Sequence, residues 1–213
     1  MTQKKDIFER DLLLASKQFP GLSIKGTPGK LFLKGILDIK DCDGNVAYSY
    51  SIEIHRADGY PFRFPKAYEV GGDIPIGSDW HKYEDNSLCL DVETEEVLKC
   101  RRGLSVSDFI IQELIPHLAN QRYRATEGHY VNEYKHGISG VKEFYAEQME
   151  TADEQMWLKI ANHVFVTKDK RRNELCYCGS GKKYKQCHER IDQRLELIGK
   201  QKVLNDFNNI GLI

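Results

Sequence analysis

The first half of the chain carries one helical pattern followed by strand patterns. Apolar residues recur at intervals of four, three and four over residues 5–19, which predicts an amphipathic helix that Pro20-Gly21 ends. Residues 31–40 and 46–55 alternate between apolar and polar side chains on either side of an Asp-Gly-Asn turn, so they predict an antiparallel hairpin. We expect a third short strand at residues 67–70.

The second half of the chain is helical in pattern after a long irregular segment. Residues 73–103 show no clean period, and an ordered loop of that length inside a compact domain is usually functional. Ser105 is a good N-cap for a following helix, in which Pro116 is expected to interrupt the regular hydrogen bonding. Residues 138–164 predict one or two more helices, and the tail from Ile191 again has helical spacing.

These patterns predict an α+β fold for a chain of 213 residues, of which 40% are hydrophobic and 30% charged. Such a chain can bury a core. It has no run of eighteen apolar residues and does not begin with the apolar core of a signal peptide, so we expect no membrane partner and a cytoplasmic location. In that reducing compartment its six cysteines are not expected to form disulfides.

The net charge of −1 conceals an acidic body and a basic tail. Residues 168–202, which begin with a charged linker at 168–172, contain eleven Lys or Arg and five Asp or Glu. Residues 83–98 contain six acidic residues and no basic one. The two charged regions therefore predict two separate functional parts.

Three of the cysteines lie close together, as Cys176, Cys178 and Cys187, and His188 follows the last of them. Three thiolates and one imidazole fill a tetrahedral zinc shell and leave no open position, so the spacing predicts a structural zinc site. A segment this short cannot form a core, and metal binding would supply its folding free energy, about 10–16 kcal/mol.

Residues 173–188, with two glycines and three lysines between the ligands, resemble the SEC-C motif. That motif is known from the C-terminus of the bacterial preprotein translocase ATPase and from many unrelated bacterial proteins. The resemblance implies zinc and docking to a protein partner. It does not imply translocase activity, because the chain has no phosphate-binding Gly-Lys-Ser/Thr loop. Nucleic acid is the weaker partner class, since only Tyr177 and Tyr184 offer stacking.

Cys89 lies between two leucines, directly after the turn-forming residues Glu84-Asp85-Asn86-Ser87. Neighbouring carboxylates disfavour a thiolate, which argues against a cysteine protease or a redox sensor. Such surroundings suit a cysteine that accepts an already activated acyl group. The alternative is that Cys89 is simply a small buried apolar residue.

The order of these elements resembles the ubiquitin-conjugating (UBC) fold over residues 5–165, and its specific part is residues 60–91 with a Tyr-Pro-x-x-x-Pro segment and Cys-Leu-Asp. That family has a His-Pro-Asn triplet whose Asn lies eight residues before the catalytic cysteine. Here His81 takes the place of the Asn, after Asp79-Trp80. His81 either donates a hydrogen bond to the oxyanion or makes a structural hydrogen bond within the loop.

The Trp-His and Leu-Cys-Leu sequences look most like bacterial ubiquitin-conjugating-like proteins encoded beside cyclic-oligonucleotide synthases in antiphage (CBASS) operons. The resemblance implies that Cys89 takes up a protein C-terminus as a thioester and passes it to a lysine amine, near which Asp91 is a candidate acidic group. The expected donor is the C-terminus of a CBASS nucleotidyltransferase. The chain has no adenylating motif, so either a separate activating enzyme is a further partner or the reaction differs from that of the family.

Two other functions stay open: a UBC-like and SEC-C adaptor that binds protein without chemistry, and a thiol hydrolase that cleaves such conjugates. We predict a UBC-like conjugating domain at 1–166 and a SEC-C zinc motif with a short helical tail at 167–213. Cys100 is the second candidate nucleophile, because the adjacent Lys99 and Arg101 favour a thiolate. Cys42, near the hairpin turn, is interpreted as structural.

Overall fold

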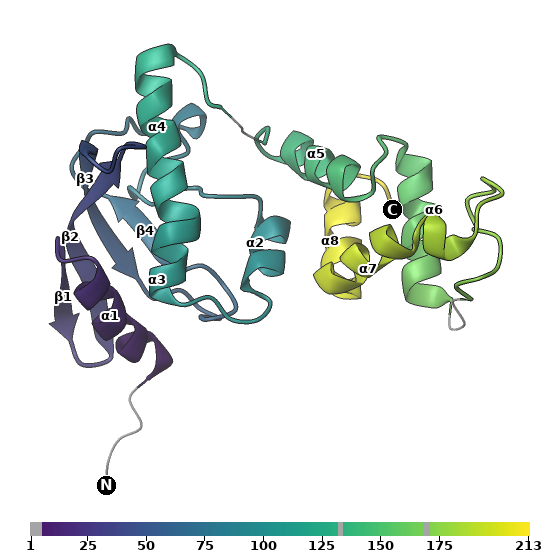
Figure 1. Cartoon of the computed structure of the whole chain (residues 1–213), viewed down its shortest axis with the longest axis horizontal. Helices are drawn as coiled ribbons and strands as arrows, with labels where there is room; N and C mark the ends of the chain where they lie inside the picture. The colour runs from purple at the N-terminus through teal and green to yellow at the C-terminus, as the bar shows by residue number, and fades with distance from the viewer. Residues whose placement is uncertain (1–5, 132–133, 168–170) are drawn as a thin grey trace, which may run out of the picture. The chain divides into compact units, whose positions relative to one another are not determined.

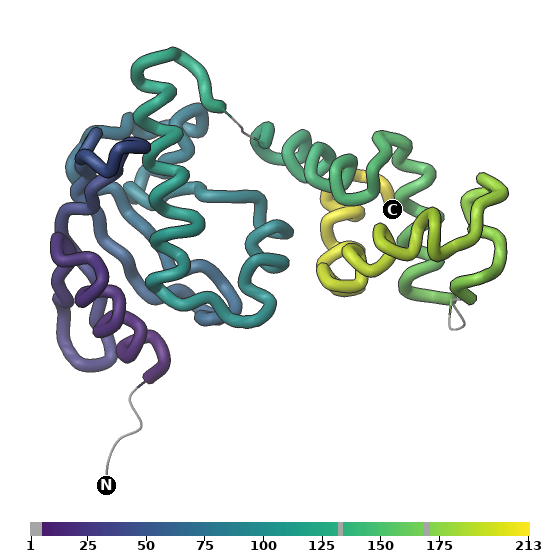
Figure 2. The backbone as a smooth tube through the Cα atoms, viewed as in Figure 1, coloured from purple at the N-terminus to yellow at the C-terminus, as the bar shows by residue number. Residues whose placement is uncertain are grey.

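A computed structural model of the protein describes residues 6–131, 134–167 and 171–213, and the chain divides into two compact units. The sheet unit comprises Met1–Asp91 and Lys99–Glu133, and the helical unit comprises Val92–Leu98 and Tyr134–Ile213. Figure 1 labels the elements of both units, and Figure 2 traces the path of the backbone. The division differs from the predicted boundary at 166/167, because residues 134–166 belong with the SEC-C segment.

The sheet unit contains a four-stranded antiparallel sheet in the order β1-β2-β3-β4. The predicted hairpin is confirmed by β2 (Lys30–Lys40) and β3 (Val46–His55), and the third predicted strand by β4 (Lys66–Glu69). β1 (Leu22–Thr27) was not predicted from the sequence. It is an edge strand in which only Leu22 is buried, and its apolar alternation ends after Leu22 and Ile24, so the pattern is too short to detect.

The predicted N-terminal helix is α1 (Ile7–Gln18), which begins at Asp6, whose carboxylate accepts the Phe8 N–H at 2.8 Å. α1 packs on one face of the sheet, and its buried side chains join those of β2 and β3 in one core. At Gly35 a Cβ atom would lie 2.0 Å from the carbonyl oxygen of Gly21, so the chain that enters β1 can lie this close to β2 only at a glycine.

One continuous helical segment follows the sheet, made of α3 (Val106–Phe109), a π-helical turn (Ile110–Leu114) and α4 (Ile115–Glu127) (Figure 1). Its predicted N-cap is confirmed, because the Ser105 hydroxyl accepts the Asp108 N–H at 3.1 Å. Pro116 lacks an N–H, and the Ile115 N–H bonds to Ile110 O, five residues back. The proline therefore widens one turn and does not end the helix.

The expectation of an unbroken loop over residues 73–103 is wrong. The segment contains a 3₁₀ turn (Ser78–Trp80) and the helix α2 (Glu93–Cys100). α2 escaped detection because its two fully buried side chains are Thr94 and Cys100, which do not form an apolar stripe.

The helical unit contains α5 (Ile138–Gln148), α6 (Glu154–Val166), α7 (Glu189–Ile198) and α8 (Lys200–Asn209). The two helices predicted within 138–164 are thus confirmed, and the predicted linker residues 168–170 lie outside the described residues. The core of this unit is aromatic, with Phe144, Tyr145, Trp157 and Phe207 all nearly inaccessible to solvent. Among the described residues, no helix combines the length and the apolar character needed to cross a membrane.

Candidate functional site

Cys89 stands at the end of a small hairpin formed by residues 77–89. Its N–H donates to the carbonyl oxygen of His81 at 2.8 Å, and the preceding Leu88 N–H donates to Ala67 O of β4 at 2.9 Å. The hairpin is therefore attached to the sheet along β4. Leu88 is buried in the core and Cys89 is partly exposed, so the cysteine is not the wholly buried residue of the alternative interpretation.

The side chain of Tyr83 is a polar neighbour of this cysteine. The phenol of Tyr83 hydrogen-bonds the Cys89 thiol, and this contact, with partial burial and the nearby charge of Asp85, raises the pKa of Tyr83 to about 12. The phenol therefore keeps its proton at neutral pH and remains a hydrogen-bond donor. Tyr83 was not among the predicted site residues, and its only signal in the sequence is its position directly before the turn-forming residues 84–87.

His81 meets Cys89 through its backbone carbonyl. Its ring faces the segment after the sheet, with its centroid 5.2 Å from the ring of Tyr130 and 6.1 Å from that of His117. Desolvation, with a contribution from His81, lowers the pKa of His117 to about 3, so His117 is neutral. These ring contacts support the structural alternative for His81, and its catalytic role stays a prediction.

The loop before Cys89 is also anchored to α4. The Gln121 side chain donates to Trp80 O at 2.9 Å and lies 3.1 Å from the Nε2 atom of His117. The Tyr130 hydroxyl donates to Gln121 Oε1 at 2.9 Å, and the Arg124 guanidinium lies over the Trp80 ring at 4.2 Å. The 3₁₀ turn that precedes His81 is thus held in place by side chains of one helix and the loop that follows it.

Asp91, the predicted acidic group, lies two residues after Cys89 and pairs with Lys99, whose Nζ atom is 2.7 Å from the Asp91 carboxylate. Lys99 also contacts Glu113 at 2.9 Å. Only 8% of the Asp91 side chain is exposed. The structure therefore gives Asp91 a structural partner, and its contact with an incoming amine stays a prediction.

The other two cysteines differ from their predicted environments. Cys100 is completely buried in the core of the sheet unit, so it is excluded as the second nucleophile. Successive residues of a helix point about 100° apart, and Lys99 extends toward Asp91 while Cys100 faces the core. Cys42 is exposed in the turn between β2 and β3, so no packing supports the structural interpretation.

In the helical unit, the four predicted metal ligands come together. One ligand atom from each of Cys176, Cys178, Cys187 and His188 lies within 4.8 Å of the others. The Nδ1 atom of His188 is 3.3 Å from the Cys176 sulfur and 3.1 Å from the Cys187 sulfur, and the Cys178 and Cys187 sulfurs are 3.6 Å apart. Ligands about 2.3 Å from a tetrahedral zinc lie roughly 3.8 Å from one another, so the donor set fits such an ion.

The fold of the segment explains this convergence. The Cys176 N–H donates to Lys182 O at 2.8 Å, which closes a tight hairpin whose turn passes through Gly179 and Gly181, both with positive φ. The second half of the ligand set follows a 3₁₀ turn (Tyr184–Gln186) that leads into α7. Burial raises the pKa of Cys176 to about 12, whereas hydrogen bonds from Ser180 and the neighbouring cysteines lower the pKa of Cys178 to about 7.

A buried carboxylate joins the cluster to its unit. Asp192 of α7 has no solvent exposure and accepts from the Tyr177 hydroxyl at 2.7 Å and the Tyr184 hydroxyl at 2.8 Å. Its carboxylate also lies 2.7 Å from Nδ1 of His163 in α6, and the His163 ring stacks on Tyr177 at 4.0 Å. Tyr177 stands between two ligands, so α6 and α7 orient the loop that holds them.

Comparison with known proteins bears on this segment. The SEC-C motif family matches residues 172–190, which contain all four ligands, so the SEC-C resemblance is confirmed there. No solved structure matches the chain. The resemblance of residues 5–165 to the UBC fold is therefore not confirmed by these comparisons and stays a prediction.

Proposed function

We propose that the chain is a ubiquitin-conjugating-like cysteine acyltransferase that carries a protein C-terminus as a thioester on Cys89 and transfers it to a lysine amine. The observation that carries this proposal is the setting of Cys89. Its thiol is partly exposed, on a hairpin that is attached to an antiparallel sheet. The Cys89 N–H donates a hydrogen bond to His81 O, and the Cys89 sulfur is hydrogen-bonded to the Tyr83 phenol.

The chemistry follows from this setting. The Cys89 thiolate attacks an activated carbonyl, and the previous carrier leaves with the electron pair. A lysine amine then attacks the thioester, the C–S bond breaks, the thiolate returns to Cys89 and the amine loses its proton to solvent. Transfer of an acyl group from sulfur to nitrogen is downhill, so the protein mainly positions the amine and stabilises the oxyanion. The Tyr83 hydroxyl is a donor at the reacting sulfur, and His81 and Asp91 remain the predicted additional groups.

The proposed donor is the C-terminus of a CBASS nucleotidyltransferase in antiphage defence, and this identity rests on sequence resemblance to the conjugating-like proteins of those operons. A separate activating enzyme would supply the energy-rich acyl group. A reducing cytoplasm would keep Cys89 available. The helical unit would dock a protein partner through its SEC-C motif.

The metal is proposed to be Zn²⁺ in a structural role. The Cys₃His donor set is one of those found in structural zinc sites, and it would occupy all four tetrahedral positions. When bound, zinc would hold the loop and the first turn of α7 together without taking part in acyl transfer.

The test uses a short fluorescent peptide whose C-terminal glycine is a thioester of 2-mercaptoethanesulfonate. Exchange with a protein thiol needs no activating enzyme. We expect a reducible adduct on Cys89 that Cys89→Ala abolishes and Cys42→Ser leaves intact. Cys42 is the matched control because it is more exposed than Cys89, so a site built for acyl transfer should load Cys89 faster despite its lower exposure. Peptide mass spectrometry assigns the loaded residue.

The second stage adds free lysine to the loaded protein and follows the label. Formation of an amide between the labelled peptide and lysine supports the transferase. Release of the labelled peptide as the free acid, faster than amide formation, supports the hydrolase. Loading of Cys42 in preference to Cys89, or no loading, would remove the transferase and leave the adaptor. Zinc is tested by elemental analysis, which should give one zinc per chain, and by its release in Cys176→Ser.

A further inference from the structure

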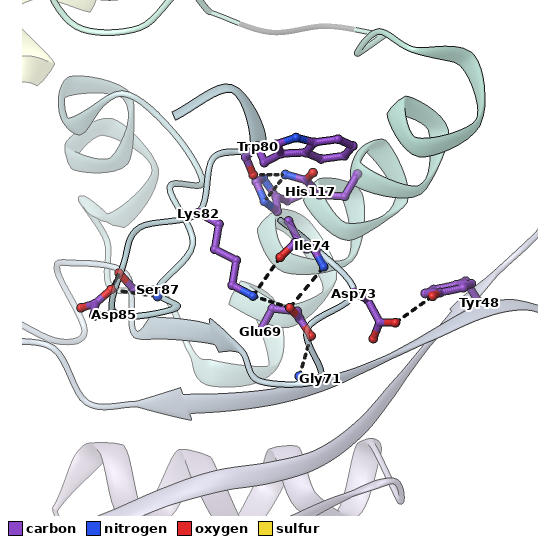
Figure 3. Close-up of polar contacts among 11 residues, drawn as sticks. Tyr48, Glu69, Gly71, Asp73, Ile74, Trp80, Lys82, Asp85, Ser87 and His117 are labelled. Carbon is purple, nitrogen blue, oxygen red and sulfur yellow. Dashed lines mark hydrogen bonds and ion pairs between the residues drawn. The ribbon is translucent and has the colours of Figure 1, made fainter. Parts of the chain in front are cut away.

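The sheet unit contains an ion pair that is almost completely shielded from water. The Lys82 Nζ atom lies 2.5 Å from Glu69 Oε2, and the exposed fractions of the two side chains are 1% and 0%. Figure 3 shows Lys82 reaching from the hairpin toward the end of β4, where the carboxylate also accepts the Gly71 N–H at 2.6 Å and the Ile74 N–H at 3.3 Å. Lys82 Nζ donates in addition to Ile74 O at 3.0 Å. The pair therefore joins β4, the following turn and the hairpin.

Lys82 is also the central residue of that hairpin's backbone. The Lys82 N–H donates to Gly77 O at 3.3 Å, and the Lys82 C=O accepts the Gly77 N–H at 2.9 Å. On its other side Lys82 pairs with Leu88. The residue before it supplies the carbonyl oxygen that accepts the Cys89 N–H. The side chain and the main chain of one residue thus fix both arms of the hairpin.

Side chains alternate between two faces along an extended segment. Lys82 points inward and Tyr83 outward, where 57% of the tyrosine is exposed; on the other arm Leu88 points inward and Cys89 outward. This alternation brings the Tyr83 phenol to the Cys89 sulfur. A shift of the pairing by one residue would exchange the faces, take Tyr83 from Cys89 and leave Glu69 buried without its cation.

We propose that the Glu69–Lys82 pair sets the register of the hairpin, so that these two residues position Tyr83 and the Cys89 thiol. Two charges taken out of water gain little net stability from one another, and an apolar pair of similar size can replace them without loss. A buried ion pair keeps its hydrogen bonds in one arrangement of the chain only, whereas an apolar pair can be buried in several arrangements. The consequence for acyl transfer rests on the proposed function, whereas the register itself does not.

The test compares Glu69→Gln/Lys82→Met with wild type in the full chain. Glutamine keeps an acceptor for the Gly71 N–H and gives up only the long hydrogen bond from the Ile74 N–H at 3.3 Å, and methionine keeps the volume of lysine. The matched control is Glu53→Gln/Lys34→Met, which removes an exposed cross-strand Lys–Glu pair at 2.8 Å. We measure thermal unfolding, hydrogen exchange of the Cys89 amide, and the ratio of iodoacetamide labelling at Cys89 to that at the exposed Cys42.

We expect the double variant to unfold at a temperature close to that of wild type, while exchange of the Cys89 amide accelerates about tenfold and the labelling ratio changes severalfold. Hydrogen exchange of the amides of β2 and β3 should not change in the double variant. In the control variant, unfolding, exchange and labelling should all stay as in wild type. Unaltered exchange and labelling in a folded double variant would overturn the proposal. A double variant that no longer folds would also overturn it, because the pair would then be needed for stability. If wild type fails to take up the peptide thioester while these results hold, the proposed function fails and the register assignment stands.

Discussion

Two buried aspartates in the helical unit allow a controlled test of how the fold supports the metal cluster. Asp192 accepts hydrogen bonds from Tyr177 and Tyr184, which lie within the metal-binding loop, and contacts His163. Asp206 of α8, which is only 3% exposed, has the same kind of surroundings away from that loop. Its three donors are the Thr94 hydroxyl at 2.6 Å, the Tyr145 hydroxyl at 2.8 Å and the Lys202 ammonium at 2.7 Å.

Replacement of either aspartate by asparagine keeps the shape and removes the charge. The new amide NH₂ group faces donors, so one or two buried hydrogen bonds are lost, and each variant should lose about 2–4 kcal/mol of unfolding free energy. Only Asp192→Asn should also weaken zinc binding, by about 10–100-fold, because groups that orient metal-binding residues contribute that much to affinity. Such a change corresponds to about 1.4–2.7 kcal/mol.

The two quantities are measured separately. Competition with the chromophoric chelator 4-(2-pyridylazo)resorcinol gives the zinc affinity of each variant. Urea unfolding followed by the fluorescence of Trp157, in a Trp80→Phe background, gives the stability of the helical unit, since the two tryptophans lie in different units. Equal zinc affinity in the two variants, with equal losses of stability, would refute the idea that Asp192 orients the ligand loop.

Three further predictions concern stability. Lys82→Met leaves a buried carboxylate without its cation and should cost about 3–5 kcal/mol in urea unfolding, whereas Lys34→Met, at an exposed pair, should cost below about 1 kcal/mol; similar costs would contradict the burial argument. Desolvation lowers the pKa of His117 from 6.5 to about 3, so on acidification the unfolded chain is protonated before the folded one. The free energy of unfolding should therefore fall by about 2.5 kcal/mol between pH 7 and pH 4.5. Urea unfolding of His117→Gln at the same pH values should not show this fall. In Gly140→Ala the new Cβ would lie 1.8 Å from a backbone carbonyl oxygen, which should cost about 2–3 kcal/mol, while Ser139→Ala on the exposed side of α5 should cost little; equal melting temperatures would exclude this close approach.

Features encoded by residues close in sequence were predictable. The C-x-C-x8-C-H spacing identified the ligand set, and the alternation over 31–40 and 46–55 identified the central hairpin. Both signals are short-range, since zinc geometry and strand periodicity each restrict which residue types stand a few positions apart.

Features that join distant residues were not predictable. Glu69 and Lys82 look like surface residues in the sequence, and each becomes buried only because the other is present. Thr94 and Asp206 are 112 residues apart, yet their hydrogen bond helps to fix the segment around α2, which has no apolar stripe of its own. A polar residue in the core depends on a partner that periodicity cannot reveal, so α2 and the anchoring of the Cys89 hairpin appeared only in the structure.

The division of the chain affects how the SEC-C motif can contribute to any activity of Cys89. The chain enters the helical unit at Val92, three residues after Cys89, leaves it after Leu98 and returns at Tyr134. The SEC-C motif shares one aromatic core with α5, α6 and α8, and Asp206 of that unit holds Thr94. A truncation after residue 166, at the boundary that the sequence suggests, would remove α7 and α8 and expose Trp157 and Tyr145 to water. Because Asp206 also holds Thr94, we expect this truncation to destabilise the whole helical unit, including residues 92–98, so the metal-binding motif is part of that unit and is not an independent tail.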